Sequence, residues 1–154
     1  MNINDFLTPA DAIVEQRALE KVQLLKELSR HATERLGLSP GSVADAIQRR
    51  ERLGSTGMGG GVAIPHARFT ELKKPFGILA RLRKPIDFDA VDGRPVDIVF
   101  LLLAPTAPEG DQLNALACIA RKLRDPRVVS DLRRAKDGGA MFHALTAESD
   151  ESAR

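Results

Sequence analysis

The feature that most constrains the fold of this chain is a nearly continuous apolar run at residues 96–103, interrupted only by Asp97. A run of this length suits a β-strand, and a strand without polar alternation needs apolar cover on both faces. Shorter apolar segments at residues 62–64 and 76–82 predict two more strands. We therefore expect a sheet that is sandwiched between helices.

Apolar residues at helical spacing predict the helices that cover this sheet. A first helix is expected from about residue 17 to residue 36, where Gly37 ends it. Ser39 and Pro40 predict the cap and first position of a second helix that runs to about residue 53.

A third long helix is expected before Asp125 and Pro126, and two short ones at residues 128–135 and 140–145, separated by Gly138 and Gly139. The apolar stripe expected on the long helix consists of Leu113, Leu116, Ala117, Ala120 and Leu123.

The order of these elements predicts an α/β fold: a single domain over residues 1–154, with a mixed parallel and antiparallel sheet flanked by helices on both faces. Residues 1–14 show no clear period and are expected to cover one edge of the core. A polar, frayed tail is expected from about residue 148.

Composition narrows the classes of function that this fold can serve. The net charge is only +2, and Trp and Tyr are absent, which argues against nucleic-acid binding. No apolar stretch approaches the ~20 residues of a membrane span, and no signal-peptide pattern is present. Cys118 is the only cysteine, which excludes an internal disulfide. We expect a cytoplasmic protein that does not insert into a membrane.

The stretch that carries chemistry is residues 54–68, which hold five glycines in their first eight positions, then a short strand, Pro65, His66 and Arg68. Glycine N–H groups can approach an anion closely, because no Cβ stands in the way. Pro65 is expected to end the strand and leave His66 at its mouth. Since the ordinary pKa of histidine is about 6.5, a mostly neutral, nucleophilic imidazole would lie beside an anion cradle. This arrangement predicts phosphoryl transfer through a phosphohistidine.

Simpler interpretations of the same residues stay open at this point. A glycine-rich turn beside a histidine is often only a tight loop beside a structural side chain. The stretch lacks the Gly-Lys-Ser/Thr end of a Walker loop, and its glycines precede the strand, unlike those of a dinucleotide fingerprint. Arg50 is either a solvated helix residue or a clamp on phosphate.

The other candidate ligands are interpreted as structural. His31 lies in the last turns of the first predicted helix, where a surface histidine or one that faces the helix dipole is common. His143 lies on the last predicted helix, next to Phe142. Asp87, Asp89 and Asp92 fall in a predicted surface connection with no nearby His or Cys, which is typical of solvated loop carboxylates. We expect no metal site and no cofactor.

Residues 50–66 closely resemble the active-site signature of IIA proteins of the bacterial phosphotransferase system. Within the fructose/mannitol class they are most similar to the nitrogen-regulatory (EIIA-Ntr) branch. Residues 85–100 and 113–123 also follow the family pattern, so the resemblance extends over almost the whole chain. It implies the phosphotransferase/anion transport protein fold.

The resemblance also implies a function, that of a cytoplasmic phosphocarrier. By it, His66 accepts a phosphoryl group from a small histidine-phosphorylated carrier of the HPr or NPr type, which a phosphoenolpyruvate-dependent enzyme has charged. The tele nitrogen of His66 is the candidate acceptor. In the nitrogen-regulatory branch the phosphorylation state tunes other proteins, such as potassium-transport and sensor-kinase systems.

The resemblance assigns a role to each site residue. Arg50 matches the family arginine that stabilises the phosphoryl group, and Arg68 matches a basic residue two positions beyond the histidine. Hydrogen bonds to the phosphoryl oxygens are expected from the glycine stretch, namely from Ser55, Thr56, Gly57 and Gly59. No metal is required.

One position departs from the family pattern. Many members carry a second histidine where this chain has Gln112. An amide can donate a hydrogen bond to a phosphoryl oxygen but cannot hold a proton charge. Gln112 is thus either a support for phospho-His66 or an exposed first-turn residue.

Two other functions are compatible with the sequence: a sugar-specific IIA component that feeds a permease, and a non-catalytic regulatory or anion-binding module on the same fold. The sequence does not give the oligomeric state.

Overall fold

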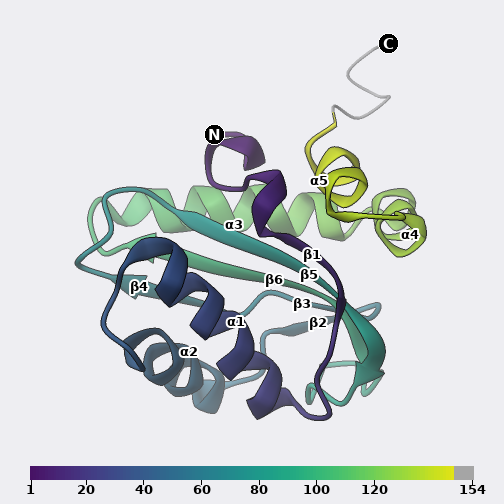
Figure 1. The fold of residues 1–154 in the computed structure, drawn as a ribbon, viewed down its shortest axis with the longest axis horizontal. Coiled ribbons are helices and arrows are strands. Elements are labelled where there is room, and N and C mark those ends of the chain that lie inside the picture. The colour runs from purple at the N-terminus through teal and green to yellow at the C-terminus, as the bar shows by residue number, and fades with distance from the viewer. Residues whose placement is uncertain (148–154) are drawn as a thin grey trace.

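The computed structural model describes residues 1–147 of the chain, so the expected polar tail lies outside the described residues. A six-stranded sheet forms the middle layer (Figure 1). Its strands are β1 (Ala12–Gln16), β2 (Gly57–Gly59), β3 (Val62–Ala63), β4 (His66–Phe69), β5 (Phe76–Ile86) and β6 (Val96–Pro105). The strand order is β1-β5-β6-β3-β2, and β4 also pairs with β6. The mixed sheet is confirmed by antiparallel pairing of β5 with β6 and of β2 with β3, and by parallel pairing of β1 with β5 and of β3 and β4 with β6.

The apolar run forms β6, and every residue of this strand except Asp97 is buried. Its side chains alternate between two apolar cores, because successive residues of a strand face opposite sides. Val99, Leu101 and Leu103 belong to one core, whereas Ile98, Phe100 and Leu102 belong to the other. The predicted cover on both faces is therefore confirmed.

Five α-helices supply this cover (Figure 1). One face carries α1 (Lys21–Leu36) and α2 (Ser42–Leu53), and the other carries α3 (Glu109–Leu123), α4 (Pro126–Arg134) and α5 (Gly138–Thr146). Gly37 ends α1 in the left-handed conformation, with φ of 67°, as predicted.

Three strands were not predicted, namely β1, β2 and β4. The first 14 residues form two 3₁₀ turns, Ile3–Asp5 and Pro9–Asp11, and the beginning of β1, which pairs in parallel with β5.

The expectation that Pro65 ends the ladder is wrong. Strand β3 ends at Ala63, and the Pro65 carbonyl accepts a hydrogen bond from the Leu102 N–H. Pairing resumes at His66, which lies opposite Leu102.

Several helix boundaries also differ from the prediction. The first helix begins at Lys21 rather than near residue 17, and the second begins at Ser42, after Gly41 with φ of 83°. Ser39 instead accepts hydrogen bonds from the backbone and hydroxyl of Ser42 in the preceding turn. Asp125 caps α4 through the Arg127 N–H. At the last helix, Asp137 caps α5 and both expected separator glycines lie inside it.

The buried stripe of α3 is turned from the predicted one. Ala115, Ile119 and Leu123 are buried, whereas Leu113 is 66% exposed and Ala117 is also exposed. Leu116 and Ala120 are partly buried against the same core. The helix therefore presents one predicted core leucine to solvent.

His31 has the structural role expected of it. Its Nε2 lies 2.9 Å from Oδ1 of Asp11, a carboxylate that is only 1% exposed and that also accepts two hydrogen bonds from Arg35. Burial by itself raises the pKa of Asp11, but hydrogen bonds from Arg35, His31 and Thr8 outweigh it and hold that pKa below its ordinary value. This network joins α1 to the turn that leads into β1.

Candidate functional site

A cleft of about 720 Å³ opens between α2, β4 and the beginning of α3. It is lined by Ala46, Arg49, Arg50, Leu53, His66, Ala67, Arg68, Thr106 and Gln112. Four of the predicted site residues, His66, Arg50, Arg68 and Gln112, are thus brought to one cleft from three separate elements, α2, β4 and α3.

Sequence reasoning missed two polar residues of this lining, Arg49 and Thr106. A signal for the first was present. Ala46, Arg49, Arg50 and Leu53 follow the i, i+3, i+4, i+7 spacing of one helix face, so the face that carries Arg50 also carries Arg49. Thr106 lies in the turn after β6 and had no such signal.

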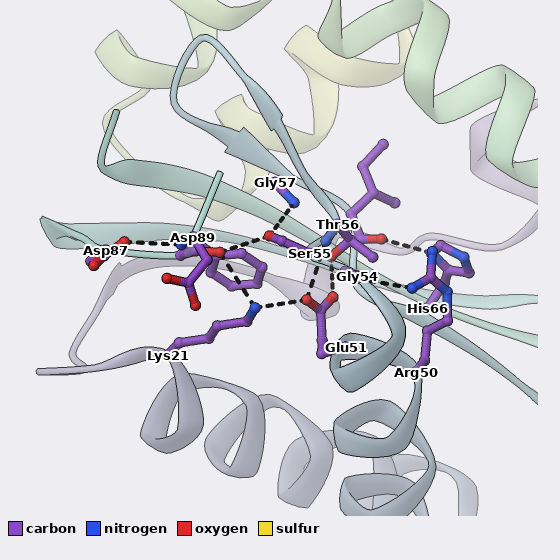
Figure 2. Close-up of polar contacts among 12 residues, drawn as sticks. Lys21, Arg50, Glu51, Gly54, Ser55, Thr56, Gly57, His66, Asp87 and Asp89 are labelled. Carbon is purple, nitrogen blue, oxygen red and sulfur yellow. Dashed lines mark hydrogen bonds and ion pairs between the residues drawn. The ribbon is translucent and has the colours of Figure 1, made fainter. Parts of the chain in front are cut away.

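The orientation of the His66 ring is fixed by a hydrogen bond to the backbone two residues earlier. Nδ1 lies 2.8 Å from the carbonyl oxygen of Ile64, across Pro65 (Figure 2). Because a carbonyl oxygen can only accept, Nδ1 carries the hydrogen, and Nε2 carries the lone pair. The half-buried ring lines the cleft, so it offers an unprotonated nitrogen at a defined position.

The surroundings of His66 favour its neutral form. Burial lowers the pKa of the imidazole below its ordinary value, and the charge of Arg50 lowers it further. The hydrogen bond to Ile64 and the charge of Glu51 act in the opposite direction without reversing the shift. At neutral pH the ring is therefore mostly neutral.

Arg50 is held at the end of α2, where Nη1 donates to the carbonyl of Gly54 over 3.0 Å (Figure 2). This bond uses one of the five N–H donors of the guanidinium. The Arg50 side chain lines the same cleft as His66. Its remaining N–H donors and its positive charge suit an anion bound at the imidazole.

The glycine stretch has a different arrangement from the expected cradle. Ser55 donates from Oγ to the carbonyl of Phe88 over 2.7 Å and accepts from the Gly57 N–H over 3.0 Å. Thr56 binds Glu51 through both its hydroxyl and its N–H (Figure 2). The lining of the cleft does not include these residues, nor Gly57 or Gly59.

What the glycines permit is a tight β2–β3 hairpin. Gly60 and Gly61 take φ of 68° and 83° in its turn, and a Cβ on Gly57 would lie 2.8 Å from Ala90. The turn is held by the Gly60 backbone, which donates to Asp92 and accepts from Arg133, each over 2.9 Å. The hairpin thereby fixes the chain that leads to His66.

Two acidic residues of the β5–β6 connection accept hydrogen bonds from backbone N–H groups. Asp92 accepts from the backbone of Gly60 and of Arg94, and Asp87 accepts from the Asp89 N–H. Among the side chains that the structure describes, which are those of residues 1–147 other than Glu109, no group of three or more His, Cys, Asp or Glu is arranged to hold a metal ion. Over the same residues, no helix has the length and apolar character needed to span a bilayer.

Comparison with known proteins gives a consistent picture. The family model described as "Phosphoenolpyruvate-dependent sugar phosphotransferase system, EIIA 2" matches residues 5–148. The chain is 44% identical over 145 residues to the nitrogen regulatory protein of Bradyrhizobium diazoefficiens, covering 94% of this chain and 95% of that protein. It is 37% identical over 127 residues to the nitrogen regulatory protein of Escherichia coli, covering 82% and 78%.

A solved structure extends this similarity to the fold. The nitrogen regulatory protein IIA-Ntr from Neisseria meningitidis superimposes with a TM-score of 0.89 at 33% identity, over 94% of this chain and 99% of that one.

Proposed function

The chain belongs to the EIIA type 2 family of the phosphoenolpyruvate-dependent sugar phosphotransferase system, and on that premise we propose that it accepts a phosphoryl group on Nε2 of His66 from a histidine-phosphorylated carrier protein. The observation that carries the proposal is the hydrogen bond from Nδ1 to the Ile64 carbonyl, which leaves Nε2 as the nucleophile in the cleft. Domains of this family accept phosphoryl groups in general, and we assign the accepting atom of this chain to Nε2 of His66.

The transfer balances without an external acid or base. The Nε2 lone pair forms a bond to phosphorus while the N–P bond of the donor breaks. The donor ring, which starts as a phosphoimidazolium protonated on its other nitrogen, leaves with that electron pair as a neutral imidazole. The His66 ring becomes an imidazolium because it keeps the hydrogen on Nδ1. The Ile64 carbonyl, 2.8 Å from Nδ1, is placed to stabilise the new positive charge.

The other cleft residues have supporting roles in this proposal. Arg50 and Arg68 neutralise the phosphoryl oxygens, and Gln112 donates an amide hydrogen bond without taking part in acid–base chemistry. The phosphorylation state then regulates partner proteins, for which potassium-transport and sensor-kinase systems are the candidates. The name that the relatives share, nitrogen regulatory protein, favours this role over a sugar-specific one.

The proposal is tested by incubating the protein with phosphoenolpyruvate, the first enzyme and the small carrier. We expect intact-mass spectrometry to show one phosphoryl group that is stable in base and labile in acid. Proton–nitrogen correlation spectra should place it on Nε2 of His66. With a demonstrably charged carrier, a protein that stays unphosphorylated would instead favour the anion-binding module.

Replacing Arg50 by glutamine tests its assigned role. We expect the rate of phosphoryl transfer to fall about 30-fold, equivalent to about 2 kcal/mol, because a charge-assisted contact with the phosphoryl group is lost. Arg50 lowers the pKa of His66, so its removal should raise that pKa. On acidification, the rate of the variant should begin to fall at a higher pH than that of the wild type.

The matched control is Arg52→Gln, which removes an exposed arginine from the same helix turn, outside the cleft lining. Its rate and pH profile should follow the wild type. Equal losses in both variants would show that general positive charge, and not Arg50, supports the transfer.

A further inference from the structure

We propose that the beginning of α2 and the side of α1 that packs beside it form a binding site for a small organic monocarboxylate (Figure 1). The site is a groove of about 370 Å³. It shares no lining residue with the His66 cleft, so the proposal is independent of the function proposed above. The uncharged part of its lining consists of Ser29, Thr33, Pro40, Gly41 and Ala44.

The beginning of α2 is not capped by a side chain. Gly41 occupies the cap position and has no side chain to offer. In the first turn, the Ser42 N–H donates to the Ser39 carbonyl over 3.2 Å. The Asp45 N–H donates to the Gly41 carbonyl over 3.0 Å, whereas the Ala44 N–H has no acceptor among the described residues. Because the N–H groups and the dipole of a helix N-terminus favour negative charge, the Ala44 N–H is a donor for an anion.

A second donor comes to the same groove from α1. Ser29 lines the groove together with Ala44, although it is only 2% exposed. Its Oγ has no hydrogen-bond partner in the part of the chain that the structure describes. A buried hydroxyl without a partner costs stability, and a bound acceptor would remove that cost. An orphan hydroxyl and an uncapped helix end at one groove therefore indicate an oxygen-rich anion.

The charges around the groove suit a single negative charge on the ligand. Lys26, Arg30 and Glu34 line it. Arg30 is bridged to Glu34 over 3.3 Å and to Glu27 over 2.9 Å, so Lys26 is the cation of the lining that remains for a ligand. Asp45, exposed in the first turn of α2, would repel a second negative charge. The groove therefore suits a carboxylate better than a phosphate dianion.

The remaining lining suits an aliphatic body on that carboxylate. Pro40 and Ala44 have no polar atoms in their side chains. A Cβ on Gly41 would meet no atom within 4 Å, so the groove is open beside this residue. A space of about 370 Å³ exceeds the size of a bare carboxylate and leaves room for several carbon atoms.

The test titrates the full chain with sodium butyrate and follows proton–nitrogen correlation spectra at an ionic strength held constant with sodium chloride. We expect the amide signals of Gly41 and Ala44 to shift and to saturate with a Kd on the order of 5 mM. Butanol, which has the same body without the charge, should bind about tenfold more weakly. Inorganic phosphate should shift these signals less than butyrate does at the same concentration.

Replacing Ser29 by alanine tests the orphan hydroxyl. We expect the Kd for butyrate to rise about tenfold, because a hydrogen bond to the carboxylate is lost. Without butyrate, the Tm of this variant should equal or exceed that of the wild type, since the hydroxyl has no partner to lose and alanine favours a helix. Lys26→Gln should raise the Kd about threefold, and about 0.5 M salt should abolish this difference.

Two matched controls remove the same side chains elsewhere. Ser130→Ala replaces an exposed serine on α4, and Lys73→Gln replaces an exposed lysine in the β4–β5 connection. Both should keep the wild-type Kd. All four variants should also keep the wild-type rate of phosphoryl transfer, because none of them changes the lining of the His66 cleft.

The outcomes separate this site from its alternatives. Equal binding of butyrate and butanol, tighter binding of phosphate at the same signals, or an unchanged Kd in Ser29→Ala would each overturn the proposal. A lower Tm of Ser29→Ala without butyrate would also overturn it, because the hydroxyl would then be bonded in the free protein. A wild type that binds butyrate as expected but accepts no phosphoryl group would overturn the proposed function alone.

Discussion

Replacing His66 by alanine is expected to abolish phosphorylation by the charged carrier protein. No other imidazole can take over, because the chain has only three histidines and only His66 lines the cleft. Nε2 of His31 is bound to the buried carboxylate of Asp11. His143 lies exposed on α5, on the opposite face of the sheet from α2. Intact-mass spectrometry after a standard incubation measures the loss.

The chain offers a matched control in His143→Gln. This variant removes an exposed histidine without disturbing the cleft, so it should gain one phosphoryl group at the wild-type rate. Retention of the phosphoryl group by the His66 variant would mean that another residue is the acceptor, and peptide mapping under basic conditions would identify it. His66→Gln, which keeps a polar side chain of similar length, should be as inactive as the alanine variant.

The sequence was sufficient to predict the layers of the fold, and four of the residues that it proposed for the site line one cleft. The apolar run of β6 requires cover on two faces whatever the details of its neighbours, and this requirement determines the three-layer architecture. Arg50 and His66 could be paired because both border one motif. Their common cleft is a consequence of α2 lying against β4.

Local patterns could not predict the partners of Ser55 and Thr56. A hydroxyl next to glycines suits an anion cradle and a packed hairpin equally well. The distinction depends on Phe88 and Glu51, whose contacts with this segment are decided by tertiary packing. The short strand β2 has the same origin, since its glycines pair with β3, which in turn pairs with β6.

The phase of α3 shows a similar limit. Its sequence has leucines and alanines around much of the helix, so i, i+4 series can be drawn through Leu113 or through Ala115. Packing against β6 selects the series that contains Ala115 and Ile119. Leu113, which was assigned to the core, is therefore left 66% exposed.

The largest expected loss of stability comes from Glu51→Ala. The Glu51 side chain is only 4% exposed and forms an ion pair of 2.9 Å with Lys21, whose own side chain is 16% exposed. The carboxylate also accepts from the backbone and hydroxyl of Thr56 (Figure 2). Its removal leaves a nearly buried ammonium group and a backbone N–H without their partner. We expect the free energy of unfolding in urea to fall by about 3 kcal/mol.

An exposed ion pair of the same chain provides the control. Glu34 is 66% exposed and lies 3.3 Å from Arg30, which is itself 63% exposed. Glu34→Ala should change the free energy of unfolding by less than about 0.5 kcal/mol, because water already screens that pair. If the two variants lost the same stability, the burial of the Glu51 carboxylate would not be the cause.

Isosteric variants separate the charge of Glu51 from its hydrogen bonds. Glu51→Gln keeps an acceptor for Thr56 but leaves the Lys21 charge unpaired, although Lys21 still lies 4.6 Å from the centre of the Phe88 ring. Adding Lys21→Met removes that unpaired charge, so the double variant should recover part of the loss. Since Glu51 follows Arg50 and binds the segment that leads into the hairpin before His66, the recovered variant should also transfer phosphate faster than Glu51→Gln alone. A double variant that is less stable than Glu51→Gln would show that Lys21 contributes mainly through its contacts with Phe88, and not through the ion pair.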